Sequence, residues 1–246
     1  MEVLYNIGKY FILMGRVFKR PSKPSLYWKQ IIYEMDSLGL GSLGIITIIS
    51  VFMGAVITLQ TASNIDSALI PAYTVGFTAR QSVILEFSPT IIALILAGKV
   101  GSNIASEIGT MRVSEQIDAL EIMGINSASY IIVPKIIASV FINPFLVLWS
   151  MFVGVFGGYL IAFFTSAVST TDYIFGIQYD FNSFGITYAL VKTVFFAFII
   201  TSIPSYYGYY VKGGALEVGA ASTKGVVSSS IVILITNYVL TQVLLI

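Results

Sequence analysis

The chain has 246 residues, of which 57% are apolar and 10% charged, and its 13 basic residues nearly balance 12 acidic ones. With a mean hydropathy of +0.89, it has too little polar surface to cover a soluble globule of this size, and its near-neutral charge gives no reason to expect nucleic acid as a partner. Neither cysteine nor histidine is present, which removes disulfides, thiol nucleophiles and the commonest general base. We therefore expect no catalytic residue, no metal site and no cofactor in this chain.

The N-terminal segment, Met1–Trp28, is expected to form an amphipathic helix in the membrane interface. Its apolar side chains recur at three- or four-residue spacing among basic ones. They are Leu4, Ile7, Phe11, Met14 and Phe18. Pro21 and Pro24 break this helix. A second short helix, Trp28–Leu38, then leads toward the bilayer, and a glycine cluster at 39, 41 and 44 marks a bend.

The apolar runs that follow exceed the roughly 20 residues a helix needs to cross a bilayer, whereas barrel strands would be about 10 residues long and alternate in polarity. The sequence thus predicts an all-α integral membrane protein with five spanning helices. They are Leu43–Ser63, Ser82–Ser106, Tyr130–Thr165, Phe184–Val211 and Val226–Ile246. Without a long linker or repeat, residues 1–246 are expected to form one domain, with interfacial helices in 1–40 and the five spans in 41–246.

Basic residues predict the orientation. Six precede the first span, Arg112 and Lys135 flank the second connection, and Lys212 and Lys224 flank the fourth, whereas the loop over residues 166–183 has no Lys or Arg. The positive-inside rule then puts the N-terminus in the cytoplasm and the C-terminus on the outer side of the membrane.

The second span carries a ridge of small residues spaced four apart, which lets another helix approach closely. These helix-packing candidates are Ala97, Gly101, Ala105 and Gly109. The same span holds Glu86 and Lys99, about 20 Å apart along a helix and so unable to pair. Because a charge in hydrocarbon is costly, we expect Glu86 to face a cavity or to pair with Arg80. The alternative is that both charges are interfacial.

A short polar helix is expected between the second and third spans. Ser114 is predicted as its N-cap, and Gly124 is placed to end it in a left-handed conformation. The candidate docking residues are three acids, Glu115, Asp118 and Glu121, and an apolar stripe, Ile117, Leu120 and Met123. This amphipathic pattern favours a docking helix for a partner protein over a solvated acidic loop.

The chain has no phosphate-binding loop, because Gly98-Lys99 is followed by Val100 rather than Ser or Thr. It should not hydrolyse ATP. Any uphill transport would draw its energy from a partner or an ion gradient.

Several uncommon strings nevertheless occur together in a fixed order. They are Glu86-Phe87-Ser88-Pro89, Ala97-Gly98-Lys99-Val100-Gly101, Glu107-Ile108-Gly109-Thr110-Met111-Arg112-Val113, Glu115-Gln116-Ile117-Asp118-Ala119-Leu120, Val133-Pro134-Lys135 and Gly213-Gly214-Ala215. With them the chain closely resembles the MlaE family of ABC-transporter permeases, over nearly its whole length after Leu43. In two places it departs from that family, which commonly has arginine where this chain has Leu85 and Lys99.

The resemblance implies a homodimeric permease of the bacterial inner membrane. It also implies a cytoplasmic ABC ATPase that holds ATP and Mg²⁺, a ring of MCE-domain proteins on the outer face, and phospholipid as the substrate. On this reading Glu115 to Met123 is the coupling helix to the ATPase. Candidate substrate-lining residues are Val56, Leu59, Gln60, Glu86, Ile235 and Tyr238.

Three alternatives to an ATP-driven permease remain open from the residues alone. The first is a secondary transporter or channel for an amphipathic substrate that works independently of ATP. The others are an intramembrane enzyme acting on lipids and a structural scaffold.

Overall fold

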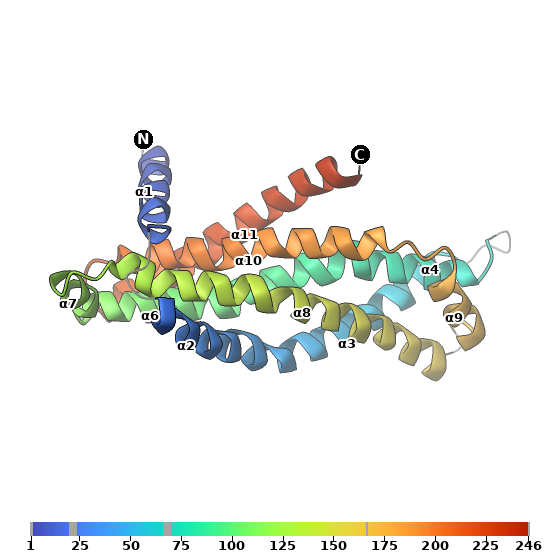
Figure 1. The fold of residues 1–246 in the computed structure, drawn as a ribbon. Coiled ribbons are helices and arrows are strands. Elements are labelled where there is room, and N and C mark those ends of the chain that lie inside the picture. The colour runs from blue at the N-terminus through green and yellow to red at the C-terminus, as the bar shows by residue number, and fades with distance from the viewer. Residues whose placement is uncertain (1, 20–23, 66–69, 166, 246) are drawn as a thin grey trace. The chain divides into compact units, whose positions relative to one another are not determined.

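The computed structural model describes residues 2–19, 24–65, 70–165 and 167–245, and within these ranges the chain is helical with no strand (Figure 1). The α-helices are α1 (Glu2–Val17), α2 (Pro24–Met35), α3 (Gly41–Asn64), α4 (Tyr73–Ser82), α5 (Ile92–Leu96), α6 (Ser102–Val113), α7 (Gln116–Ile122), α8 (Ser127–Phe164), α9 (Thr170–Gln178), α10 (Phe184–Tyr209) and α11 (Ala215–Leu245). Three π-helical segments join some of them: η1 (Asp36–Leu40), η2 (Val83–Ile91) and η3 (Ala97–Gly101). The predicted all-α class is confirmed.

Five helical stretches of the described chain are long and apolar enough to cross a membrane, which confirms the predicted number of spans. They are Tyr27–Asn64, Tyr73–Val113, Ser127–Phe164, Phe184–Tyr209 and Ala215–Leu244. Three of them begin well before the predicted residue. The first begins sixteen residues before Leu43, the second nine residues before Ser82 and the fifth eleven residues before Val226.

The short second helix and the first span, which were expected to meet at a bend marked by glycines, are joined by a π turn, η1. α2 therefore runs through η1 into α3 as one helix. Gly39 lies in this turn against the side chain of Ile142, where a larger residue would not fit. A wider turn thus accommodates the glycines without ending the helix.

Helix α1 forms as predicted, and it has one face of buried apolar side chains and another of exposed ones. Leu13, Met14 and Val17 are buried, whereas Leu4 and Phe11 are exposed. Residues 20–23, which include Pro21, lie outside the described residues. Placement of α1 in a membrane interface stays a prediction.

Helix α9 lies in the connection between the third and fourth spans, which was expected to be a loop. It packs against α4: Gly176 lies against the backbone of Tyr73, and Gly76 against the backbone of Tyr173. The Tyr173 side chain is buried in a core with Ile57, Val75 and Ala162, and its hydroxyl donates to the Val155 carbonyl at 3.0 Å. Nine residues were too short a run to show helical periodicity in the sequence.

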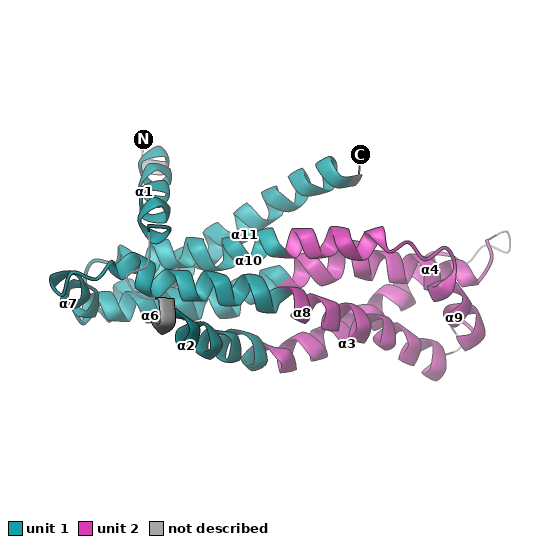
Figure 2. Ribbon diagram, in the orientation of Figure 1, with its two compact units in different colours: residues 1–41, 93–143, 194–246 teal, residues 42–92, 144–193 magenta. Residues whose placement is uncertain are grey.

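The described residues form two compact units (Figure 2). Unit 1 comprises residues 1–41, 93–143 and 194–246, and unit 2 comprises 42–92 and 144–193. Every boundary between them falls inside a helix, whereas domain boundaries usually fall in exposed linkers. The expectation of a single domain stays a prediction.

In unit 1, the small-residue ridge of η3 and α6 is buried against α10 and α11. Ala97 and Ala105 are fully buried. A side chain at Gly101 would meet Pro204, and one at Gly109 would meet Val218. Small residues here let the helix backbones approach one another closely.

In unit 2, α3 and α8 come closest at Gly54 and Gly154. A Cβ atom added to Gly54 would overlap the carbonyl oxygen of Gly154, and one added to Gly157 would overlap the carbonyl oxygen of Val51. Because these neighbours are backbone atoms, they cannot move aside as a side chain can.

We predict that Gly54→Ala destabilises the protein by about 2 kcal/mol or more, since overpacking forces the helices apart. The matched control is Gly44→Ala on the same helix, where an added Cβ meets nothing within 4 Å. That variant should unfold at the same temperature or higher, because alanine favours helix by up to about 1 kcal/mol over glycine. Thermal unfolding in detergent compares them, and equal melting temperatures would contradict the close helix contact.

Candidate functional site

The connection between α6 and α8 is built around the short helix α7, and its start differs from the prediction. Ser114 does not cap α7, because its hydroxyl donates back to the Thr110 carbonyl at 2.8 Å. The chain instead reverses through Glu115, whose φ of 59° is left-handed, and no side chain caps the helix. α7 therefore begins at Gln116.

The end of α7 follows the prediction. Gly124 has a φ of +75°. The N–H groups of Gly124 and Ile125 donate to the carbonyls of Glu121 and Leu120, both at 3.0 Å. This left-handed glycine satisfies carbonyl groups that a helix end otherwise leaves free.

The apolar side chains of α7 do not form the single docking stripe that was predicted, because some of them face the protein. Ile117 is fully buried and Leu120 is partly buried, so this side of α7 packs on the protein. The exposed apolar residues are Ile122 and Met123, which are 88% and 65% exposed. A partner would therefore meet the C-terminal end of α7 rather than Ile117.

Two of the three predicted acids brace α7 against other helices of unit 1. Arg112 of α6 donates to Asp118 at 2.7 Å. Glu121 accepts from the hydroxyls of Ser127 on α8, at 2.9 Å, and of Tyr209 on α10, at 3.0 Å. The Arg112 guanidinium also lies over the Tyr209 ring, 5.9 Å from its centroid. Glu115, by contrast, is exposed.

A buried lysine ties three more segments of unit 1 together. Lys135 on α8 donates to Glu34 on α2 at 2.6 Å and to Glu107 on α6 at 2.8 Å. Lys135 and Glu34 are buried, whereas Glu107 is about half exposed. The sequence indicated Lys135 only as an orienting charge. Glu34, the only acidic residue of α2, was the signal in the sequence that could have indicated a buried partner.

In unit 2, Glu86 was expected to face a cavity or to pair with Arg80, and it pairs with Lys192 instead. It accepts from Lys192 of α10 at 2.9 Å and from Tyr188 at 3.3 Å. Its second oxygen accepts from Thr90 at 3.2 Å. The Lys192 side chain is fully buried, and that of Glu86 is 43% exposed, so this carboxylate lies at the edge of the cluster.

Arg80 serves the end of α9 instead. Its guanidinium donates to the carbonyls of Ile177 and Tyr179, at 2.6 and 3.0 Å, and lies over the Phe77 ring. A helix C-terminus carries free carbonyls and a partial negative charge, which stabilise the buried guanidinium there. Lys99 is exposed, and its ammonium donates to the Gly41 carbonyl.

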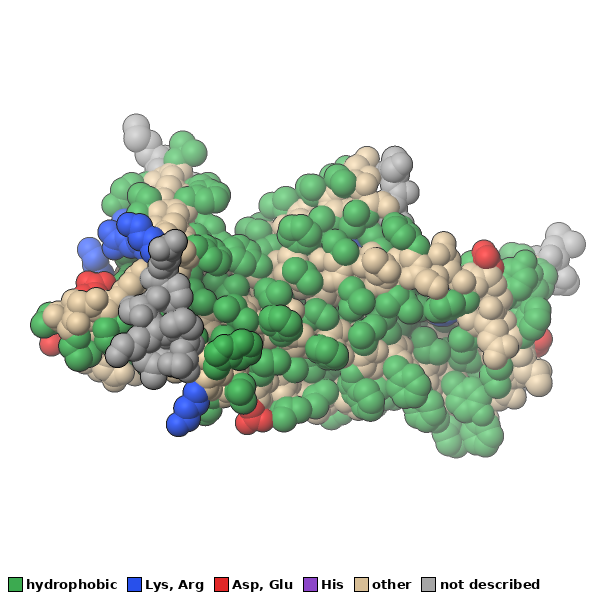
Figure 3. All heavy atoms as spheres, viewed as in Figure 1, with side chains coloured by type: hydrophobic (Ala, Val, Ile, Leu, Met, Phe, Trp, Pro, Cys, Tyr) green, Lys and Arg blue, Asp and Glu red, His purple; other side chains and the backbone are tan. Residues whose placement is uncertain are grey.

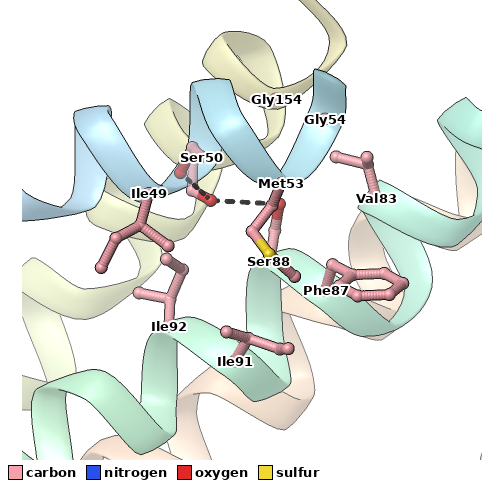
Figure 4. A pocket seen from close by; sticks show the side chains of 11 residues that line it. Ile49, Ser50, Met53, Gly54, Val83, Phe87, Ser88, Ile91, Ile92 and Gly154 are labelled. Atoms are coloured by element: carbon pink, nitrogen blue, oxygen red, sulfur yellow. Dashed lines mark hydrogen bonds between the residues drawn. The ribbon is translucent and has the colours of Figure 1, made fainter. Parts of the chain in front are cut away.

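Three hydroxyls meet between α3, η2 and α8 in unit 2. Ser50 donates to Ser150 at 2.8 Å, and Ser150 donates to Ser88 at 3.2 Å. Figure 4 shows them among apolar side chains, including Met53 and Phe87. The cavity beside them holds about 10 Å³, which is room for about one water molecule. The hydroxyls thus join helices and leave no room for a substrate.

The remaining predicted lining residues are exposed on two helices. Val56, Leu59 and Gln60 share one face of α3, and Ile235 and Tyr238 share one face of α11. Since α3 and α11 belong to different units, a shared substrate cavity stays a prediction. Among the described residues, no three acidic side chains are grouped in a way that could hold a metal ion.

We predict that Glu86→Gln lowers the free energy of unfolding by about 3 kcal/mol, because it leaves the Lys192 ammonium buried without its carboxylate. A double-mutant cycle with Lys192→Met should show a large coupling between the two residues. As a control, Asp118→Asn breaks an ion pair that is partly exposed and should cost less than about 1 kcal/mol. Equal losses for the two acids would contradict a buried pair at Glu86.

The sequence of this chain is similar to those of a known protein family. Residues 31–243 match the family described as Permease MlaE. A probable ABC transporter permease protein of Rickettsia bellii is 37% identical over 98% of this chain and 93% of its own length. The chloroplastic protein TRIGALACTOSYLDIACYLGLYCEROL 1 of Arabidopsis thaliana is 31% identical over 94% of this chain and 66% of its own length.

A third relative is the intermembrane phospholipid transport system permease protein MlaE of Haemophilus influenzae, 29% identical over 95% of this chain and 89% of its own length. The matches extend over nearly the whole chain, from α2 to α11, and confirm the family that the sequence motifs indicated. The chain belongs to the MlaE family of permeases and is a membrane-spanning transport subunit rather than an enzyme.

Proposed function

We propose that this chain is the permease subunit of an ATP-driven transporter that moves phospholipid between the bacterial inner membrane and an MCE-protein ring on its outer face. Two copies form the membrane part, and a cytoplasmic ABC ATPase binds ATP and Mg²⁺ below them. The lipid substrate is suggested by the names of relatives, one of which is a phospholipid transport permease. The N-terminus and α7 then face the cytoplasm, and the C-terminus faces the periplasm.

The observation that carries this proposal is the way α7 is held. A helix of seven residues is not stable alone, yet Arg112, Ser127 and Tyr209 fix it to α6, α8 and α10. Its exposed end presents Ile122 and Met123. An exposed apolar tip on a firmly held helix is suited to bind an ATPase and to transmit the movement of the ATPase to the spanning helices.

In the mechanism we propose, ATP binding closes the ATPase pair and displaces α7. The ion pair of Arg112 and Asp118 transmits this displacement to α6, and the hydrogen bonds of Glu121 transmit it to α8 and α10. The spans then rock around the lipid cavity. The residues proposed for ATPase coupling are Glu115, Asp118, Leu120, Glu121, Ile122 and Met123, with Ile117 as the buried anchor of α7.

Glu86 is proposed to lie at headgroup level in the lipid path. Its pairing with Lys192 makes the cluster neutral overall, while its half-exposed carboxylate still accepts hydrogen bonds. Mostly apolar contacts, from Val56, Leu59, Ile235 and Tyr238, would line the rest of the path together with the polar Gln60. Leu85 cannot take over the role of the arginine common in the family, because it carries no charge.

We predict that Ile122→Asp with Met123→Asp releases the ATPase subunit and abolishes ATP-dependent lipid transfer, because charged side chains cannot enter an apolar docking pocket. Co-purification of the complex measures binding, and transfer of labelled phospholipid from proteoliposomes measures transport. The matched control, Ile122→Val with Met123→Leu, keeps the apolar surface and should behave like the wild type. Retained binding and transport in the aspartate variant would contradict the docking role, and ATP-independent transport by the chain alone would contradict the proposed function.

We predict further that Tyr209→Phe keeps the ATPase bound and hydrolysing ATP but lowers the amount of lipid moved per ATP by about fivefold or more, since allosteric couplings of this kind are worth about 1–3 kcal/mol. The variant removes a hydroxyl bound to Glu121 and keeps the ring under Arg112. Tyr210→Phe is the control, because Tyr210 contacts Lys9 through its ring. An unchanged ratio of transport to hydrolysis would show that this hydrogen bond transmits nothing.

A further inference from the structure

Unit 1 contains an open apolar groove between α1, α10 and α11 that the proposed transport path does not use. Its volume is about 580 Å³, within the range of small-molecule sites. The lining is mostly aromatic and aliphatic. It includes Phe11 of α1, Ile203 and Tyr206 of α10, and Ile231 and Val232 of α11.

A polar cavity of about 360 Å³ continues from one end of this groove, and the two share Asn6, Tyr206 and Tyr207. Three lysines line the polar cavity: Lys9, Lys212 and Lys224. Its acid is Glu217, whose carboxylate already accepts the Gly214 N–H at 2.9 Å. The cavity therefore has a net positive charge beside an apolar channel. Figure 3 shows Lys and Arg side chains gathered beside α1, next to an extended hydrophobic surface.

Specific contacts hold the walls of the groove in place. Tyr10 donates to Ser202 at 2.8 Å, and Tyr206 donates to Asn6 at 3.2 Å, so that α1 is attached to α10 at two points. The Lys9 ammonium lies 4.9 Å from the centroid of the Tyr210 ring. Burial raises the pKa of Tyr10, so this residue stays neutral and adds no negative charge to the site.

We propose that this composite site binds an anionic phospholipid of the surrounding membrane, with an acyl chain along the groove and the headgroup phosphate among the three lysines. Charge complementarity selects this occupant, since a lipid supplies an apolar chain and an anion in one molecule. The groove is formed partly by α10 and α11, which span the membrane, so lipid is the molecule in contact with them at high concentration. Binding here needs no ATP and does not rest on the proposed transport function.

The test uses the absence of cysteine from the sequence. Ile231→Cys carries a single bimane label in the groove. The protein is reconstituted in phosphatidylcholine vesicles that contain a minor fraction of a brominated lipid, which quenches the label. One set of vesicles contains brominated phosphatidylglycerol, and a second set contains brominated phosphatidylcholine at the same fractions. We expect the label to be quenched at roughly thirtyfold lower concentrations of the anionic lipid, because a net charge of about two, at about 1 kcal/mol for each lysine near a membrane surface, favours the anion.

Leu234→Cys is the matched control for position, because Ile231 and Leu234 lie on the same helix and are 54% and 52% exposed, but Leu234 does not line the groove. It should show no preference between the two lipids. Substituting Lys9, Lys212 and Lys224 together by Gln should abolish the preference at Ile231, whereas Lys29→Gln, at an exposed position on α2, should leave it unchanged. Ile203→Trp should fill the groove and reduce quenching by both lipids.

Two results would overturn the proposal. Equal quenching by both lipids at Ile231 would mean that the lysines select nothing. Weak quenching by both would mean that a second copy or another protein covers the groove. Either result leaves the proposed transport function standing, because that function is tested by ATPase binding and lipid transfer.

Discussion

Burial of charge among helices that cross a membrane constrains this structure more than any other factor. An ammonium group in a low-dielectric environment is stable only with a partner. Lys135 and Lys192 are both buried, and each meets a carboxylate within 3 Å. Their partners lie on other helices, so each lysine fixes the rotation and height of one helix against another. Apolar packing cannot do this alone, because lipid tails solvate leucine as well as a neighbouring helix does.

The same constraint explains what could be predicted from the sequence. Hydropathy predicted the five spans because a run of about 20 apolar residues in a membrane protein is stable almost only as a helix that crosses the bilayer. Small residues at four-residue spacing, such as Gly101 and Ala105, marked a packing face because that spacing repeats on one side of a helix. Gly124 marked a left-handed turn because glycine adopts that conformation without strain. Each of these inferences depends on local sequence only.

Most of the features that were missed depend on residues far apart in sequence. Glu86 was expected to face a cavity or to pair with Arg80, six positions away, but it pairs with Lys192, more than 100 positions away. Arg80 meets the carbonyl groups at the end of α9, a helix that the sequence did not reveal. Ser114 was predicted to cap α7, but its hydroxyl bonds to the preceding helix, and Glu115 makes the turn instead. For Glu86 and Arg80, contacts between distant segments decided the outcome, whereas the bond that competes at Ser114 is local.

Helix α10 contacts the proposed coupling helix, α7, and also forms part of the proposed lipid site. Tyr209 connects this helix to Glu121 of α7, and Tyr206, one turn earlier, lines the lipid groove and bonds Asn6 of α1. A movement of α7 that pulls on Tyr209 therefore also acts on the wall of the groove. A bound lipid can influence transport only if it binds more tightly to one position of α10 than to the other. Coupling of this kind is reciprocal. If the lipid binds one position of α10 more tightly, then the affinity of the site for the lipid must change by the same factor when the ATPase moves α7.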